Sequence, residues 1–479
     1  MASTATETLL TFLEEADYGD IPDSAREAAK IFLLDTIAVG LSGAIEPASR
    51  KVRRAARGWG VGEDAKPIGS DGALPAPSAA FVSAFHIHCQ EWDCVHEQAV
   101  VHAMSVITGA LSAFVQKNPA ISGQDLIMAL CLGVDLAARL GIATDAPLRF
   151  FRPATAGLMG TTAVLARLSG LKGDCFRDAL GLAYSQVAGT MQAHVEGSVA
   201  LPLQVALAAR AAITAVDMAG EGLSGPHDVF EGPFGYFTLI ENGGEMDVVT
   251  HGLGQRWCIS ELSHKPFPSG RASHAALDAV SRLVVDSSRA LDDVTSIRLL
   301  APPLIRRLIG RPFKTDMSVN YARLCLPYLT CRLILDGRLD GASFAEEKLN
   351  DPRIAEKADM ITVELDGNEN VNALCPQAVE IAYADGKHDS LEILATKGAP
   401  GNPLTSIEQR GKIISCLGLY EELDRETEAD RLISQGQDIE SMTSAADLFT
   451  ALPVYDEDKT ARLNHRKELL NEPEDHRPL

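Results

Sequence analysis

The sequence predicts a mainly α-helical protein in which a large all-helical domain is joined to a smaller α+β domain. Residues 4–265 consist largely of Ala- and Leu-rich stretches with helical periodicity. From about Asp293 the apolar pattern changes to the alternation that is typical of strands. After Gly401-Asn402-Pro403 the helical pattern returns and continues to about Leu452. Because 479 residues exceed what one ordinary core organises, we expect two domains.

Several helices of the first part are apolar on more than one face, which predicts that they pack in several layers. A Ser cap opens the second of them, and Pro153 lies in the first turn of another, where proline is favoured. The predicted helices are Thr4–Ala16, Ser24–Ser42, one or two within Ala80–Gln116, Asp125–Gly141, Arg152–Ser169, Asp174–Gln192 and Leu203–Ala219.

The second part combines strands with one longer helix. Asp385-Gly386 between two alternating runs is a strong hairpin signal. The predicted strands are Val294–Ala301, Ile361–Leu365, Ala378–Ala384 and His388–Ala395, and the predicted helix is Ser318–Asp336. We therefore expect a helical domain at 1–265, an α+β domain at 266–400, returning helices at 401–455 that pack on the first domain, and a flexible tail at 456–479.

Composition limits the partners of this protein. The net charge is −22, which argues against nucleic acid and anionic membranes, because both require a basic surface. A local cationic cluster could still bind a small anionic substrate. The nine cysteines form no CxxC pair, which is typical of a reducing compartment. With no secretory signal pattern and no apolar stretch expected to span a membrane, a cytoplasmic location is predicted.

The segment Phe85–His102 concentrates ionisable side chains in an otherwise apolar region. The spacings Cys89-x4-Cys94 and His96-x5-His102 fall outside the usual zinc patterns, so no metal is predicted here. A solvated helix face with satisfied core histidines is one interpretation. The other is an active-site wall that directs Asp93, His96 and His102 at a substrate.

A second group of basic residues, Lys265, Arg271 and His274, lies at the expected domain junction. Clefts commonly form at such junctions, although an ordinary linker with surface charges would look similar. Arg152 stands at a predicted helix start, where it could be a carboxylate clamp or take part in a surface ion pair. Gln192 and Gln204 are candidate polar lining in an Ala/Gly-rich setting, together with His194 and Glu196.

No nucleophile elbow, Walker loop or dinucleotide-binding motif is found, so proton chemistry next to a carboxylate remains the best interpretation. Five passages resemble the MmgE/PrpD family in the family's order: 32–44, 84–113, 152–173, 265–280 and 317–339. The resemblance implies a helical domain completed by a C-terminal helical segment, a smaller α+β lid, a homodimer, and neither cofactor nor metal.

The family's acidic motif corresponds to Glu91–His96, its next histidine to His102, and its later Lys and His to Lys265 and His274. The chain departs from the family at five positions. The family pattern has Asp and Thr at Cys94 and Val95, His at Arg152 and Lys near Leu201, and its decarboxylase branch has His at Gly270.

The resulting hypothesis is a cofactor-independent lyase that dehydrates a small di- or tricarboxylate. Asp93 with His102 or His96 would move the proton, and His274 would act as an acid or bind a carboxylate. Arg152, Lys265 and Arg271 would hold carboxylates, with Glu91, Gln192 and Gln204 as further substrate contacts. The alternatives are an epimerase or isomerase with bases such as His102 and Lys265, a decarboxylase, a non-catalytic carboxylate-binding protein, and a zinc enzyme.

Overall fold

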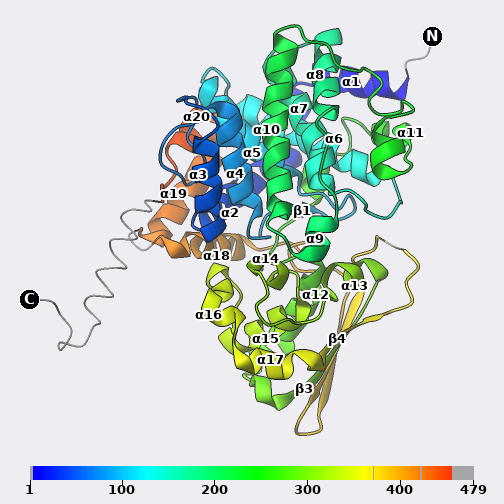
Figure 1. The fold of residues 1–479 in the computed structure, drawn as a ribbon, viewed down its shortest axis with the longest axis vertical. Coiled ribbons are helices and arrows are strands. Elements are labelled where there is room, and N and C mark those ends of the chain that lie inside the picture. Colours follow the sequence, from blue (N-terminus) through cyan, green and yellow to red (C-terminus); the bar gives the residue numbers. More distant parts are fainter. Residues whose placement is uncertain (1–3, 371, 421–422, 456–479) are drawn as a thin grey trace, which may run out of the picture.

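The computed structural model describes residues 4–370, 372–420 and 423–455, so the predicted tail at 456–479 lies outside the described residues. The larger part of the molecule is a helical assembly, which occupies the upper half of Figure 1. Its helices before the domain junction are α1 (Ala5–Glu15), α2 (Asp23–Ala44), α3 (Pro47–Arg57), α4 (Ala76–His88), α5 (Ala103–Lys117), α6 (Gly123–Ile142), α7 (Arg152–Leu168), α8 (Asp174–Tyr184), α9 (Gln192–Glu196), α10 (Ala200–Gly220) and α11 (Met246–Thr250).

Helix α4 is buried except at Pro77 and packs against α2, α5 and α10. Small residues permit this close packing. A Cβ atom built on Gly43 of α2 would lie 1.8 Å from the carbonyl oxygen of His86, so only glycine allows α2 to approach the end of α4. This contact fixes the place where the histidine-rich segment leaves the helix.

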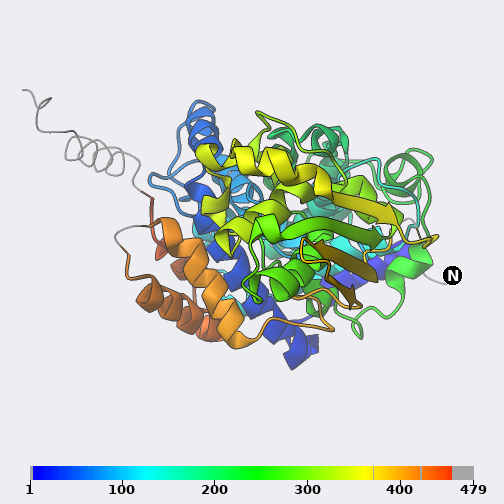
Figure 2. The ribbon, with the colours of Figure 1, turned by 90° about the horizontal axis from the view of Figure 1, so that it is seen from below.

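The smaller part contains a four-stranded sheet in the order β4-β3-β5-β6. Strand β3 (Val294–Ala301) pairs in parallel with β4 (Ile361–Leu365) and antiparallel with β5 (Gln377–Tyr383), which pairs antiparallel with β6 (His388–Ile393). Figure 2 shows the sheet and its helices in front of the larger part. These helices are α12 (His274–Val280), α13 (Pro303–Ile309), α14 (Val319–Ala322), α15 (Leu326–Asp336), α16 (Glu346–Leu349) and α17 (Pro352–Lys357).

The chain returns to the larger part in α18 (Ser406–Cys416), α19 (Arg425–Gln437) and α20 (Ala446–Thr450). Helices α18 and α19 pack against α2, and α20 packs against α5. The larger apolar core accordingly contains Ile413, Leu432 and Leu448 beside residues from the first half of the chain. A separate core extends from Ala272 to Ile393 in the smaller part.

The predicted mainly α fold with a smaller α+β part is confirmed. Three local predictions differ from the structure. Residues 89–102 are not helical, because α4 ends at His88 and the segment crosses to the short strand β1 (Val95–His96), which pairs with β2 (Leu262–Ser263). The predicted helix Ser318–Asp336 is divided before Pro327, and the one predicted to run to Gln192 ends at Tyr184.

Within the described residues, α10 is the one single helix that is long and apolar enough to cross a membrane. Helices α2 and α3 would meet the same criteria only as one bent span, and they meet at 89°. Core helices of water-soluble proteins share this composition, and α10 packs against α4, α7 and α8.

Candidate functional site

A small cavity of about 70 Å³ lies between the helical part and the α+β part. The helical part contributes Glu91, Val95, Val100, His102, Leu148, Phe151, Arg152, Met191 and His194. The segment from the other side contributes Gly270, Arg271, Ala272, Leu308, Ile309, Leu324 and Leu374. Its largely apolar wall with a few polar groups is typical of a small-molecule site.

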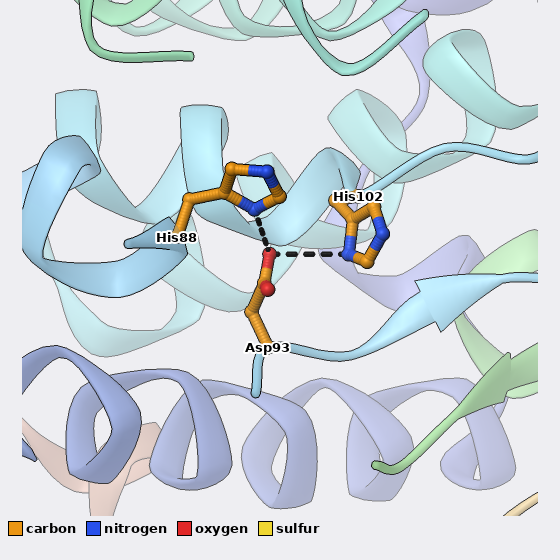
Figure 3. A group of neighbouring side chains, drawn as sticks. All are labelled: His88, Asp93 and His102. Atoms are coloured by element: carbon orange, nitrogen blue, oxygen red, sulfur yellow. Dashed lines mark hydrogen bonds and ion pairs between the residues drawn. The ribbon is translucent and has the colours of Figure 1, made fainter. Parts of the chain in front are cut away.

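Two histidines share one carboxylate beside this cavity (Figure 3). His88 is the last residue of α4, and its Nδ1 lies 2.8 Å from Oδ2 of Asp93. His102 precedes α5, and its Nδ1 lies 3.1 Å from the same oxygen. The hydroxyl of Ser105 also donates to Oδ2. Because α4 and α5 pack side by side, the turn between them brings all three groups together.

The hydrogen bonds of His102 fix its tautomer. Its Nδ1 is also 3.0 Å from the carbonyl oxygen of Cys94, and carbonyl and carboxylate oxygens can only accept. Nδ1 therefore carries the proton, and Nε2 keeps its lone pair on the side of the ring away from Asp93 (Figure 3). Since His102 lines the cavity, this nitrogen is positioned to act as a base.

The charges of the group support this arrangement. Burial alone would raise the pKa of Asp93, but His88 and His102 hold it well below its usual range. Burial would lower the pKa of His88, yet Asp93 outweighs it and raises this pKa. Burial lowers the pKa of His102 despite Asp93, and Lys265 lowers it further. Of the two histidines, His88 is therefore the one that carries a positive charge more readily, and His102 is neutral.

Glu91 and Lys265 form a second pair behind this group. Lys265 Nζ is fully buried, donates over 3.0 Å to both the carbonyl oxygen and Oε2 of Glu91, and lies 4.0 Å from Asp93 Oδ1. Burial would raise the pKa of Glu91, but Lys265 and both histidines lower it to about 2. Glu91 has φ of 53°, a strained conformation for a non-glycine residue. Glu91 lines the cavity and Lys265 does not. Lys265, which the sequence predicted to bind a carboxylate of the substrate, therefore binds the carboxylate of Glu91 instead.

Arg152 is engaged in an ion pair. Its Nε and Nη2 donate to Glu241, the last residue of a π-helical turn, over 2.9–3.1 Å, and its Nη1 donates to the carbonyl oxygen of Ala99. Tyr236 donates to the same carboxylate. Arg152 is therefore neither the free clamp nor the surface ion pair that the sequence left open, because its ion pair with Glu241 is buried.

Arg271 is similarly occupied. Its Nε lies 2.9 Å from Oε1 of Glu97, and its Nη2 lies 2.7 Å from the same oxygen. Its Nη groups also donate to the carbonyl oxygens of His264, Thr396 and Lys397. Both arginines line the cavity, but the guanidinium of each is already paired with a carboxylate of the protein.

Four other predicted site residues lie away from the cavity. His96 accepts from the backbone N–H of Ala99 and lies 3.2 Å from Glu261, so it serves as a structural link. His274 is buried behind Arg271, and burial together with that arginine holds its pKa well below the usual range. Gln192 is exposed and pairs with Glu196, and Gln204 donates to the carbonyl oxygen of Thr190.

The sequence indicated His194 only as one of four polar groups that could line a pocket, and it assigned no role to His88. His194 lines the cavity from α9, and burial with the nearby Arg311 lowers its pKa to about 4. The signal for His88 was present, because it lies in the histidine-rich segment and closes a helix that carries apolar residues on every side.

Two groups in the described part of the chain have metal-ligand chemistry: His88 with Asp93 and His102, and His96 with Cys258 and Glu261. In the first, both Nδ1 atoms already contact one carboxylate oxygen. In the second, Arg256 pairs with Glu261, and burial raises the pKa of Cys258, which opposes the thiolate that zinc requires. Neither group presents a free ligand set.

Comparison with known proteins identifies similar chains. The family model of the MmgE/PrpD N-terminal domain matches residues 7–248, and that of the MmgE/PrpD C-terminal domain matches residues 267–435. A cis-aconitate decarboxylase from Homo sapiens is 27% identical over 379 residues, 76% of this chain and 77% of the relative. A cis-aconitate decarboxylase from Aspergillus terreus is 26% identical over 396 residues, covering 77% and 80%. A cis-aconitate decarboxylase-like protein from Aspergillus oryzae is 25% identical over 431 residues, covering 85% and 89%.

Proposed function

The chain belongs to the MmgE/PrpD family, and on that premise we propose that it is a lyase that moves a proton at a carbon atom next to a carboxylate. The observation that carries this proposal is the imidazole of His102, whose Nδ1 is held by Asp93 while its ring faces the cavity. A base that is oriented by a carboxylate is a recurrent device for proton abstraction.

The proposed reaction is a dehydration. His102 Nε2 takes the proton from the carbon next to the carboxylate, and the C–H electron pair forms the double bond as the C–O bond breaks. The leaving hydroxide takes the proton from the imidazolium, which releases water and restores neutral His102. Asp93, at 3.1 Å, stabilises the imidazolium while it exists.

Decarboxylation is the second candidate, because the names of the relatives favour it. In that reaction the C–C bond to the carboxylate breaks, carbon dioxide leaves, and His102 would protonate the carbon that remains. The two candidates require opposite starting states of His102, neutral for dehydration and protonated for decarboxylation.

The other expectations remain predictions. An epimerase needs a second base on the opposite face of the carbon, and Lys265 is held by Glu91 behind the cavity wall. A non-catalytic carboxylate-binding protein would use the same cavity. A homodimer, a cytoplasmic location and a small anionic carboxylate as ligand are carried forward from the sequence.

We expect kcat/KM of a dehydration to rise with pH and then level off, with an apparent pKa below the ordinary value of about 6.5 for histidine, because burial lowers the pKa of His102. The measurement is kcat/KM between about pH 4.5 and 8. If activity instead declines as pH rises through this range, His102 acts as an acid and decarboxylation replaces dehydration.

His88→Gln is expected to shift the rise of kcat/KM to higher pH. His88 lowers the pKa of His102, so an uncharged side chain in its place leaves the full charge of Asp93 to the remaining imidazole. The amide can still donate to Asp93, which keeps the carboxylate in place. An unchanged pH profile in the folded variant would show that His88 has a packing role only.

The test of function is a panel of carboxylic acids in three assays on one sample. Alkene absorbance follows dehydration, released carbon dioxide follows decarboxylation, and deuterium uptake from D₂O without either product indicates epimerisation. The panel includes 2-methylcitrate, citrate and cis-aconitate as well as 3-hydroxy acids with one carboxylate. An absence of all three signals across the panel would refute the proposal.

A further inference from the structure

The cations around the cavity are already neutralised by the protein itself. Each has a carboxylate partner within 3.0 Å: Arg152 with Glu241, Arg271 with Glu97, and Lys265 with Glu91. The backbone carbonyl bonds described above occupy further donors of each group. A substrate with two or three carboxylates would therefore give up its hydration without gaining free charged partners.

One side of the cavity differs. Arg311, which follows α13, donates from Nη2 to the carbonyl oxygen of His194 over 3.0 Å and lies 3.5 Å from His194 Nδ1. The guanidinium of Arg311 lies over the ring of Tyr321 at 4.8 Å, and its buried Nη1 has no hydrogen-bond partner among the described residues. Glu91 acts on the charge of Arg311 but is itself paired with Lys265, so Arg311 has no carboxylate partner of its own among the described residues.

His194 connects this cation to the cavity, which it lines. With its pKa lowered to about 4, the ring is neutral near pH 7. Because Arg311 can only donate, Nδ1 of His194 is the acceptor and the ring proton lies on Nε2. An N–H donor backed by a guanidinium can hold one carboxylate.

Apart from Glu91, His102, Arg152 and Arg271, the rest of the wall is apolar. Val95, Phe151, Met191, Leu308, Ile309 and Leu374 line it. The space beside Gly270 is also filled by hydrocarbon, since a Cβ atom built there would lie 2.7 Å from Cδ2 of Leu324. Such a wall gains free energy from hydrocarbon groups and none from additional charges.

We propose that the cavity binds a substrate with a single carboxylate, anchored at His194 with Arg311 behind it, whose hydrocarbon body lies along the apolar wall. This inference rests on the proposed function and narrows its substrate class. It replaces the di- or tricarboxylate expected from sequence, because that expectation relied on Arg152, Lys265 and Arg271 as free clamps.

Isothermal titration with two unreactive probes tests the proposal. 4-Methylpentanoate, with one carboxylate and a branched chain, is expected to bind at least about tenfold more tightly than tricarballylate, with three. Arg311→Gln is expected to weaken 4-methylpentanoate binding about tenfold or more. The matched control is Arg306→Gln, an exposed arginine of the preceding helix, which should leave the affinity unchanged.

A second variant tests the neutralised cations. Glu97→Gln releases Arg271 from its partner and should strengthen tricarballylate binding about tenfold, with circular dichroism to verify the fold. The proposal is overturned if tricarballylate binds as tightly as 4-methylpentanoate to the unmodified protein, if neither probe binds, or if Arg311→Gln and Arg306→Gln behave alike.

Turnover separates this proposal from the proposed function. If the predicted binding order holds but no acid of the panel reacts, the lyase assignment fails and the ligand class stands. If only tricarboxylates are converted, the ligand class fails and the lyase assignment stands.

Discussion

His102→Gln is expected to lower kcat by about 10²–10⁴-fold, the usual contribution of a positioned general base. Glutamine can still donate a hydrogen bond toward Asp93 but cannot take a proton from carbon. Because the side chain of His102 is 12% exposed at the cavity edge, the substitution should leave the fold intact. Steady-state kinetics on the best substrate of the panel, with a thermal melt of each variant, provide the measurement.

His96→Gln is the matched control, since sequence alone could not decide between these two histidines. His96 links Glu261 to the 96–101 turn and does not reach the cavity. We expect its replacement to change stability more than kcat. A large loss of kcat in His96→Gln, with little loss in His102→Gln, would move the base to His96 and refute the present assignment.

The secondary structure was predictable wherever one periodicity persists. Strand Val294–Ala301 and the hairpin around Asp385-Gly386 follow directly from alternation and turn chemistry. The segment between α4 and α5 was not, because its helix-like composition is overridden by tertiary contacts. Glu91 adopts φ of 53°, and Val95–His96 pair with Leu262–Ser263, far along the chain.

The residue types of the site were predictable from the sequence, but the ion pairs that its arginines form were not. Asp93 lies five residues after His88 and nine residues before His102, and such local crowding of ionisable groups is visible in a sequence. Arg152 and Glu241 are 89 residues apart, and Arg271 and Glu97 are 174 apart. No periodicity encodes such a pairing, so two arginines that are neutralised in the structure could be taken for free clamps.

Glu241→Ala is expected to destabilise the protein by about 3–5 kcal/mol, because it leaves the guanidinium of Arg152 buried without a counter-charge. Arg152 is 1% exposed, and the Glu241 side chain is 5% exposed. The free energy of unfolding from urea titrations measures the loss. The variant also frees Tyr236 and the π-helical turn that ends at Glu241, so part of the effect is local.

A double variant distinguishes the effect of the unpaired charge from the effect of the lost packing. Arg152→Met combined with Glu241→Met removes both charges and keeps similar volume, and buried ion pairs replaced in this way often lose little stability. We expect the double variant to unfold at a higher urea concentration than Glu241→Ala, which would show that the pair neutralises Arg152 rather than supplying stability of its own. If the double variant is as unstable as Glu241→Ala, the loss comes from packing around α7, and the account of Arg152 as a neutralised cation is wrong.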